Sequence, residues 1–197
     1  MTRTVHPIEA ESYAILRSRV GTAGLPPCSR AVTERVIHAS ADLAYLTDLV
    51  CDEDALAAAA RALHGGAPVV TDSEMVAAGV TSRNAICRVR APQAAALAAR
   101  TGITRSAAGV RLASQEVGSG AVWVVGTAPT ALLELITLGV APALIVGLPV
   151  GFVGAAESKQ ALRDSGLPAL TNRSEKGGAA VAAAAVNALL YLEEDLP

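Results

Sequence analysis

Three side chains that could control a proton lie close together in the first third of the sequence. Arg35, His38 and Asp42 have i, i+3 and i+7 spacing, which places them on one stripe of a predicted helix, beside its apolar face. Histidine changes its charge near neutral pH, and an arginine and a carboxylate nearby would control the charge and orientation of its ring. The triplet indicates acid/base chemistry centred on His38, although a solvated polar helix face would show the same spacing.

A second set of side chains is suited to binding an anionic group. Thr104, Arg105 and Ser106 precede a helix-like stretch, where a capping hydroxyl and an arginine fork suit an anion. Helix capping by Thr104 alone would explain that hydroxyl equally well. Ser158 and Lys159 follow a glycine-rich segment and could bind a carboxylate, although a surface lysine is the commoner case. Arg105, Ser106 and Lys159 are therefore candidate ligand contacts.

The sequence lacks the signatures of several other kinds of site. Its 3 cysteines are widely spaced, without a CxxC pair or a His/Cys cluster at zinc-ligand spacing, which favours free thiols in a reducing cytosol. Gly147, Gly151 and Gly154 follow the pattern G-x-x-x-G-x-x-G and not G-x-G-x-x-G, and no Walker lysine pattern occurs. A nucleotide-binding enzyme is therefore a weak alternative, and we expect neither a metal nor a cofactor.

Composition and charge narrow the class of ligand. The chain has 197 residues, of which 52% are hydrophobic and 3% aromatic, and its formal net charge is −2. This length suits one domain covering residues 1–197. The absence of a basic block argues against nucleic acid as a partner, whereas a small acidic ligand needs only a few arginines.

No segment of the sequence is suited to crossing a membrane. Residues 1–20 carry several charges, which neither a signal peptide nor a membrane span would tolerate. The apolar run 132–153 is interrupted by glycines and prolines, so its pieces are too short for a bilayer. We expect a cytoplasmic protein with no membrane partner.

The elements that must position these side chains follow from hydrophobic periodicity. Three helices are predicted first, at about 7–20, from a capping Ser29 to about Leu46, and from about Asp52 to the Gly65-Gly66 pair. Short β-branched runs then predict strands at 68–73, 85–89, 121–126 and 143–152, each followed by a helix, at 73–79, 92–100, 129–138 and 155–164. An extended piece at 168–172 precedes a final helix at 178–192.

Apolar strands that alternate with helices indicate a parallel sheet covered on both faces. The predicted fold class is therefore α/β, a three-layer α/β/α arrangement with a mainly parallel sheet and a helical N-terminal segment. Ligands of such sheets bind where the strands end, near the N-termini of the following helices. The loops at 71–75, 126–130 and 147–159 are the candidates for that position.

Seven segments of the chain resemble a known family. The two most specific are DSEMVAAGV at 72–80 and PVGFVGAAESK at 149–159. The others are HPIEAESYAILRS, ERVIHASAD, TRSAA, GTAPTAL and GGAAVAAAAVNAL. In order and spacing these segments resemble precorrin-8X methylmutases, and the likeness covers nearly the whole chain.

The resemblance implies an isomerase of cobalamin (corrin) biosynthesis that moves a methyl group from C11 to C12 of precorrin-8X, giving hydrogenobyrinic acid. The family's catalytic histidine matches His38, which would be the acid/base residue. Its substrate-contacting serine in the first helix matches Ser12, and its arginine three residues before the histidine matches Arg35. The resemblance also implies a homodimer with the active site near the subunit interface, and no cofactor.

Two alternatives stay open. The substrate could be cobalt-precorrin-8 instead of cobalt-free precorrin-8X, or the chain could be a non-catalytic corrinoid-binding carrier. The chain also departs from the family pattern at Thr127, where many members carry asparagine, so an amide contact there is in doubt. Turnover, and not ligand binding, separates the enzyme from the carrier.

Overall fold

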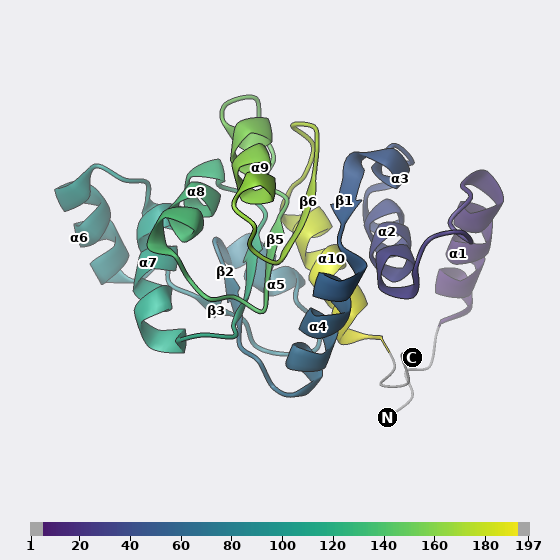
Figure 1. Ribbon diagram of the computed structural model, residues 1–197, viewed down its shortest axis with the longest axis horizontal. Coiled ribbons are helices and arrows are strands. Elements are labelled where there is room, and N and C mark those ends of the chain that lie inside the picture. Colours follow the sequence, from purple (N-terminus) through teal and green to yellow (C-terminus); the bar gives the residue numbers. More distant parts are fainter. Residues whose placement is uncertain (1–5, 193–197) are drawn as a thin grey trace.

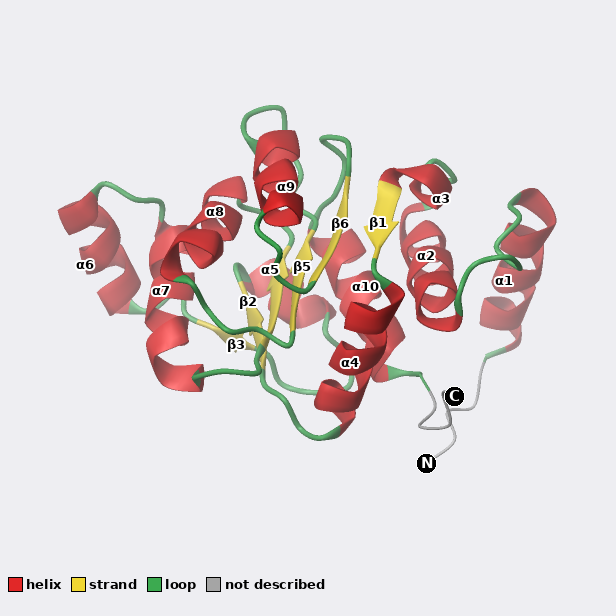
Figure 2. Cartoon of the chain, viewed as in Figure 1, coloured by secondary structure: helices red, strands yellow, loops and turns green. Residues whose placement is uncertain are grey.

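A six-stranded sheet forms the centre of the molecule (Figure 1). The computed structural model describes residues 6–192, and its strands are β1 (Leu49–Cys51), β2 (Val69–Thr71), β3 (Ile86–Cys87), β4 (Val122–Val125), β5 (Leu144–Gly147) and β6 (Ala169–Asn172). Their order across the sheet is β1-β6-β5-β4-β2-β3. All neighbouring strands are parallel except β1, which is antiparallel to β6 (Figure 2).

The four inner strands, β6, β5, β4 and β2, are buried on both faces, which explains their nearly continuous apolar sequences. In β4, Val122 and Val124 belong to one core cluster, whereas Trp123 and Val125 belong to the other. All four side chains are at most 1% exposed. Successive side chains of a strand point to opposite faces, so each inner strand contributes to both clusters. The predicted, mainly parallel sheet is confirmed.

Helices cover both faces of the sheet and make three layers (Figure 1). One face carries α2 (Pro27–Ser40), α4 (Glu53–His64), α5 (Glu74–Gly79) and α10 (Ala179–Leu190). The other carries α7 (Arg105–Val117), α8 (Pro129–Leu138) and α9 (Ala155–Asp164), with α6 (Pro92–Thr101) packed on α7. The predicted N-terminal helix, α1 (Pro7–Arg19), packs against α2 at one end of the molecule. The three-layer α/β/α prediction is confirmed. Within the described residues no helix combines the length and apolarity needed to span a membrane.

Helix α2 begins earlier than the sequence predicted. Ser29 was the expected cap, but the helix starts at Pro27, where a fixed φ and a missing N–H suit the first helical position. The carboxylate of Glu53 accepts hydrogen bonds from the backbone N–H groups of Cys28 and Ser29, at 2.8 and 2.9 Å. The N-terminus of α2 is therefore capped by a side chain from the start of α4, which a local sequence pattern does not reveal.

Helix α2 also ends earlier, at Ser40 and not near Leu46. Ala41 adopts a left-handed conformation with φ of 54°, which stops the helix. The Ser40 hydroxyl accepts a hydrogen bond from the Asp42 N–H at 3.2 Å, and such local bonds compete with helical ones. The remainder of the predicted helix forms the short α3 (Tyr45–Asp48).

Strand β1 was not predicted, and β3 is shorter than predicted. Each has only two or three residues, all of them half-buried. Segments this short at the two edges of a sheet show no measurable periodicity in the sequence. Their pairing with β6 and β2 identifies them as strands, and that pairing is a long-range property.

The loop that follows β6 is fixed by a buried lysine. Lys159 of α9 is 0% exposed, and its ammonium donates hydrogen bonds to Asn172 Oδ1 at 2.9 Å, to the Lys176 carbonyl at 2.7 Å and to the Ser174 carbonyl. Asp48 accepts hydrogen bonds from the Asn172 amide and the Ser174 hydroxyl, both at 2.7 Å. These bonds tie the loop to α9 and to α3.

The loops after β5 and β6 touch each other through a glycine. Gly177 has φ of 152°, and a side chain at this position would collide with the Leu148 carbonyl oxygen. The N–H of Gly178 donates to the same oxygen at 2.9 Å. Two of the motifs singled out in the sequence, GLPVGF and GGAAV, therefore form one surface at the C-terminal ends of the strands.

Replacing Lys159 with methionine should destabilise the protein strongly. Lys159→Met leaves the buried Asn172 Oδ1 and two partly buried carbonyl oxygens without the ammonium donor, so we expect the free energy of unfolding to fall by roughly 2–4 kcal/mol. Urea denaturation measures the change. Lys176→Met is the matched control, because Lys176 forms only a partly exposed ion pair with Asp42, and it should have a much smaller effect. Equal stability of the two variants would contradict the bracing role of Lys159.

Candidate active site

His38 lies in the last turn of α2, where two consecutive residues of α1 contact its ring. Ser12 Oγ is 2.9 Å from His38 Nδ1, and the tautomer of the histidine decides which of the two groups donates. The Tyr13 ring stacks on the imidazole with centroids 4.9 Å apart and an angle of 8° between the planes. The predicted acid/base residue is therefore held at one edge and on one face.

Helix α1 is attached to α2 mainly through charged side chains. Among the 13 residues of α1, all of them described, only Leu16 is buried, and burying one leucine contributes roughly 1.5–3 kcal/mol. Arg17 donates to the Glu34 carboxylate through Nε at 3.1 Å and through Nη2 at 2.7 Å. Arg35 Nη1 donates to Glu9 Oε1 at 2.8 Å. These two ion pairs bring the serine and the tyrosine to the histidine.

Glu34 is the most deeply buried member of this network. Its side chain is 4% exposed, and it also accepts hydrogen bonds from Thr22 Oγ1 at 2.6 Å and from Arg30 Nε at 3.2 Å. Burial opposes the charged form, but the hydrogen bonds from Arg17, Thr22 and Arg30 outweigh it and lower the pKa of Glu34. The carboxylate is thus charged at neutral pH and can hold Arg17.

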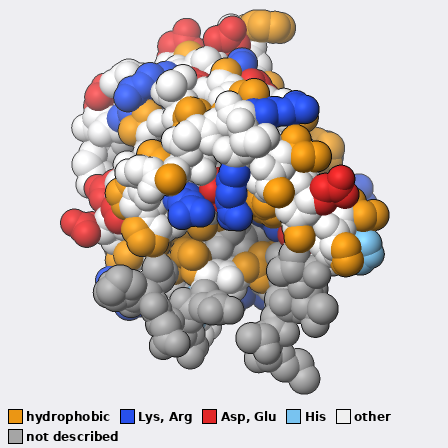
Figure 3. Space-filling model, turned by 90° about the vertical axis from the view of Figure 1, so that its right-hand side faces the viewer, with side chains coloured by type: hydrophobic (Ala, Val, Ile, Leu, Met, Phe, Trp, Pro, Cys, Tyr) orange, Lys and Arg blue, Asp and Glu red, His pale blue; other side chains and the backbone are white. Residues whose placement is uncertain are grey.

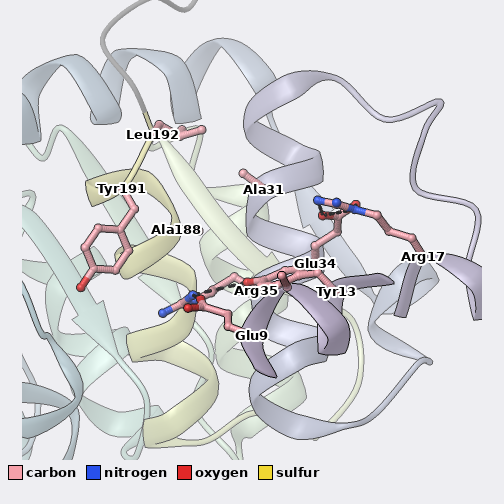
Figure 4. Close-up of a pocket in the computed structure, with 10 residues that line it drawn as sticks. Glu9, Tyr13, Arg17, Ala31, Glu34, Arg35, Ala188, Tyr191 and Leu192 are labelled. Atoms are coloured by element: carbon pink, nitrogen blue, oxygen red, sulfur yellow. Dashed lines mark hydrogen bonds and ion pairs between the residues drawn. The ribbon is translucent and has the colours of Figure 1, made fainter. Parts of the chain in front are cut away.

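A cavity of about 520 Å³ opens beside the histidine, between α1, α2 and α10 (Figure 4). Tyr13 borders both this cavity and the His38 ring. The Arg35 guanidinium lies 5.5 Å from the centre of the Tyr191 ring, which comes from the end of α10. The lining residues are Glu9, Ala10, Tyr13, Arg17, Ala31, Glu34, Arg35, Ala188, Tyr191 and Leu192. On the surface of the molecule that is seen from the α1 end, Lys and Arg side chains lie near the middle, among apolar side chains (Figure 3).

Asp42 does not join Arg35 and His38, and this part of the predicted stripe is wrong. Because α2 ends at Ser40, Asp42 has left the helix, and it pairs with Lys176 at 2.7 Å. The hydrogen bond from Lys176 lowers the pKa of Asp42. The polar partner of the histidine is Ser12, from another helix.

Arg105 and Ser106 lie far from His38 in the same chain. They form the first turn of α7, behind Thr104, whose hydroxyl caps the helix by accepting from the Ala107 N–H at 3.2 Å. Helix α7 and helix α1 are at opposite ends of the molecule (Figure 1). Arg105 is exposed and Ser106 is partly exposed. Their predicted contact with an anionic ligand stays a prediction.

The geometry favours a structural role for Lys159 over the predicted ligand contact. Its side chain is buried, and its three ammonium protons all have acceptors within the protein. Burial lowers the pKa of Lys159 to about 8, and the nearby Asp48 carboxylate opposes this shift. Its substrate contact stays a prediction that no observed geometry supports.

Two of the candidate loops at the strand ends are joined by a buried carboxylate. Asp72 is 1% exposed and accepts hydrogen bonds from the backbone N–H groups of Gly126, Thr127 and Ala128, at 3.1, 2.9 and 2.8 Å. The Thr127 hydroxyl also donates to Asp72, at 2.6 Å. Thr127, where the chain departs from the family pattern, therefore makes its contact with Asp72 of the same chain.

The two other histidines lie at helix ends. His6 caps α1 by accepting from the Ile8 N–H at 3.2 Å, and His64 is the last residue of α4. In residues 6–192, no group of three or more His, Cys, Asp or Glu side chains could hold a metal ion.

Comparison with known proteins identifies the family. The sequence model for precorrin-8X methylmutase matches residues 7–192. The chain belongs to the precorrin-8X methylmutase family. It is 43% identical to a precorrin-8X methylmutase of Pseudomonas aeruginosa, over 92% of this chain and 93% of that protein. It is 38% identical to a cobalt-precorrin-8 methylmutase of Methanothermobacter thermautotrophicus, over 96% of this chain and 94% of that protein.

A solved member of the family has the same fold. The precorrin-8X methylmutase of Thermus thermophilus superimposes with a TM-score of 0.85 at 34% sequence identity, covering 93% of each chain. Membership in this methylmutase family makes the chain an isomerase of cobalamin biosynthesis, as the sequence motifs predicted. Some relatives are named for precorrin-8X and others for cobalt-precorrin-8, so sequence similarity does not distinguish between the two substrates.

Ser12 was predicted as a site residue, but Tyr13 and Arg17, which also bear on the histidine, were not. Tyr13 and Arg17 are four residues apart on α1, which places them on one face, and the Arg17 guanidinium lies 5.5 Å from the Tyr13 ring centre. That spacing was available in the sequence. The contact with His38 was not, because nothing in the sequence indicated which face of α1 packs on α2.

Breaking the Glu34 network should loosen α1 and leave the rest of the methylmutase fold intact. Glu34→Gln removes the charge that Arg17 binds, so we expect a stability loss of roughly 1–3 kcal/mol and faster hydrogen exchange in residues 7–19. Because the pKa of Glu34 is lowered by folding, its contribution is present above the ordinary glutamate value of about 4.3 and is lost as the pH falls through the lower value of the folded protein.

Hydrogen exchange read by mass spectrometry at neutral and acidic pH checks this prediction. Glu116→Gln is the matched control, because Glu116 accepts a similar two-nitrogen contact from Arg88. That pair lies between α7 and the end of β3, away from α1. Unchanged exchange of α1 in Glu34→Gln would show that this carboxylate does not hold the helix.

Proposed function

We propose that this chain catalyses the shift of a methyl group from C11 to C12 of precorrin-8X, giving hydrogenobyrinic acid, with His38 as its acid/base residue. The observation that carries the proposal is the position of the His38 ring. It is fixed by Ser12 and Tyr13 beside a cavity that also contains Arg35. The His38 imidazole, which can transfer a proton, thus lies near the Arg35 guanidinium, which can bind an anion, and beside a cavity that can admit a ligand.

The reaction requires the protein to protonate the substrate and to hold it in the right orientation. The methyl group leaves C11 and bonds to C12 within one molecule, so no external donor or acceptor of the group is needed. Protonation of the conjugated macrocycle near a ring nitrogen makes it more electron-poor, which lowers the barrier to migration. General acid catalysis of this kind contributes roughly 10²–10⁴-fold to the rate. A cleft that fixes the ring contributes orientation.

Scattered donors suit a ligand with many peripheral carboxylates. We propose that Ser12 and Arg35 contact the substrate near His38, and that Arg105 and Ser106 bind carboxylates elsewhere on its rim. Because α7 is far from α1 within one chain, the two sets meet only if a second chain supplies one of them. This separation supports a homodimer with its active site near the subunit interface.

The remaining parts of the proposal follow from the family. The match over residues 7–192 supports one methylmutase domain in a cytoplasmic biosynthetic enzyme. A specific alternative concerns the metal content of the substrate, because relatives at similar identity are named for cobalt-precorrin-8. Parallel assays with precorrin-8X and cobalt-precorrin-8 decide between these substrates. A corrinoid carrier would bind either compound and convert neither.

Removing the imidazole should abolish most turnover while leaving binding largely intact. We expect His38→Ala to lower kcat roughly 10²–10⁴-fold, because the acid/base group is lost, with corrinoid affinity within a few-fold of the wild type. The visible spectrum of precorrin-8X mixed with enzyme measures conversion. His64→Ala is the matched control and should retain full activity, since His64 lies at the end of α4. Equal turnover by His38→Ala would rule out the acid/base assignment.

Removing the guanidinium of Arg35 should mainly weaken substrate binding. We expect Arg35→Ala to raise the Kd for hydrogenobyrinic acid about 10- to 100-fold, the effect of one charged hydrogen bond. Glu9→Gln separates this from a loosened α1, because it weakens the same Glu9–Arg35 ion pair but keeps the arginine. Titration followed by absorbance gives both affinities. Unchanged affinity in Arg35→Ala, or an equal loss in Glu9→Gln, would contradict a direct contact.

A further inference from the structure

Two neighbouring residues of α1 restrain the His38 ring in different ways. Ser12 meets the ring edge at Nδ1, at 2.9 Å. Tyr13 covers a ring face, nearly parallel to it at 8°. Within residues 6–192, Ser12 is the one hydrogen-bond partner of the His38 side chain, so Nε2 is the ring nitrogen left for a ligand.

The two contacts limit different motions about the same side-chain bond: the hydrogen bond limits flipping of the ring, and the stack limits rocking of its plane. The outer side-chain torsion of histidine is broad and roughly two-fold, so the imidazole can rock and can flip by about 180°. A hydrogen bond at Nδ1 selects one of the two flipped orientations. It still allows the ring plane to rock about the hydrogen-bonded edge. A parallel aromatic ring stops the rocking, because offset stacking is favourable only when the planes are aligned.

Tyr13 is itself held in place from two directions. The Arg17 guanidinium lies 5.5 Å from its ring centre, and Arg17 is fixed by the buried Glu34. The Tyr13 hydroxyl accepts a long hydrogen bond from Arg35 Nη1 at 3.4 Å. The Tyr13 ring thus makes a stacking contact and a cation–π contact, whereas the hydroxyl bond is weak at its distance.

We propose that Tyr13 is a positioning residue for the methyl shift, and that its ring, not its hydroxyl, keeps the His38 plane aligned so that Nε2 meets the macrocycle. The inference rests on the proposed acid/base role of His38. Tyr13 also borders the cavity, so one side chain contacts both the cavity and the histidine ring. A displacement of about 1 Å at a reacting group can cost 10²-fold in rate, which makes such alignment consequential.

Variants that separate the ring from the hydroxyl test the inference. Tyr13→Phe keeps the stack and should retain kcat within about 3-fold. Tyr13→Leu and Tyr13→Met remove the stack but keep an apolar side chain, and they should lower kcat roughly 10- to 100-fold with KM changed by less than about 3-fold. Two non-aromatic variants are used so that at least one keeps α1 docked, which hydrogen exchange of residues 7–19 verifies. Ser18→Ala, a surface change on the same helix, is the control and should behave as the wild type.

Histidine NMR gives a readout that does not depend on turnover. In the wild type the carbon-bound protons of the His38 ring should resonate upfield of those of His6 and His64, because they lie over the face of the Tyr13 ring. Tyr13→Phe should keep that shift. Tyr13→Leu and Tyr13→Met should lose it. His38→Ala assigns the resonances and shows, by its turnover, whether the histidine is needed at all.

The outcomes are distinguishable. The inference is supported if a non-aromatic variant with α1 docked loses both the upfield shift and kcat. Tyr13→Phe must retain both. A non-aromatic variant that loses the shift but keeps full kcat overturns it, as does a Tyr13→Phe variant with the low kcat of Tyr13→Leu. Full activity of His38→Ala removes the proposed function itself, whatever Tyr13 does.

Discussion

The buried carboxylate of Glu34 is the interaction on which the arrangement of the site depends. It is almost inaccessible to water, yet it stays charged because Arg17, Arg30 and Thr22 donate hydrogen bonds to it. Of these three donors Arg17 belongs to α1, and a buried carboxylate that loses a charged donor is destabilised, so the Arg17–Glu34 pair selects the docked position of α1. With α1 fixed, its serine and tyrosine reach His38.

The molecule combines a rigid scaffold with a helix attached by polar contacts. The sheet is buried on both faces, and its strand-end loops are braced by Asp72, Asp48 and Lys159. The helix α1, by contrast, has one buried side chain. Local stability follows buried apolar contact, so α1 should open at a lower free energy than the sheet. Such a division suits a site that must admit a large, flat macrocycle and still align one imidazole.

The sequence predicted well those features whose signal is local. The β-branched runs gave five of the six strands in position, and four of these are inner strands buried on both faces. Gly65 marked the end of α4 as expected. Features that depend on distant contacts were missed or misplaced. The start of α2 is set by Glu53 of another helix, and β1 exists only through its pairing with β6. The same distinction applies to the site. The acid/base role of His38 stays a prediction, and of its expected neighbours Asp42, four residues away, pairs with Lys176, whereas Ser12, in another helix, contacts the ring.

A structure of this protein with bound hydrogenobyrinic acid tests the central claim most directly. We expect His38 Nε2 to lie within about 2.6–3.2 Å of a macrocycle atom, or one water away, while Nδ1 keeps its contact with Ser12 and the ring stays stacked on Tyr13. A corrin ring bound elsewhere, or one bound in the cavity with Nε2 directed away from it, would contradict the account.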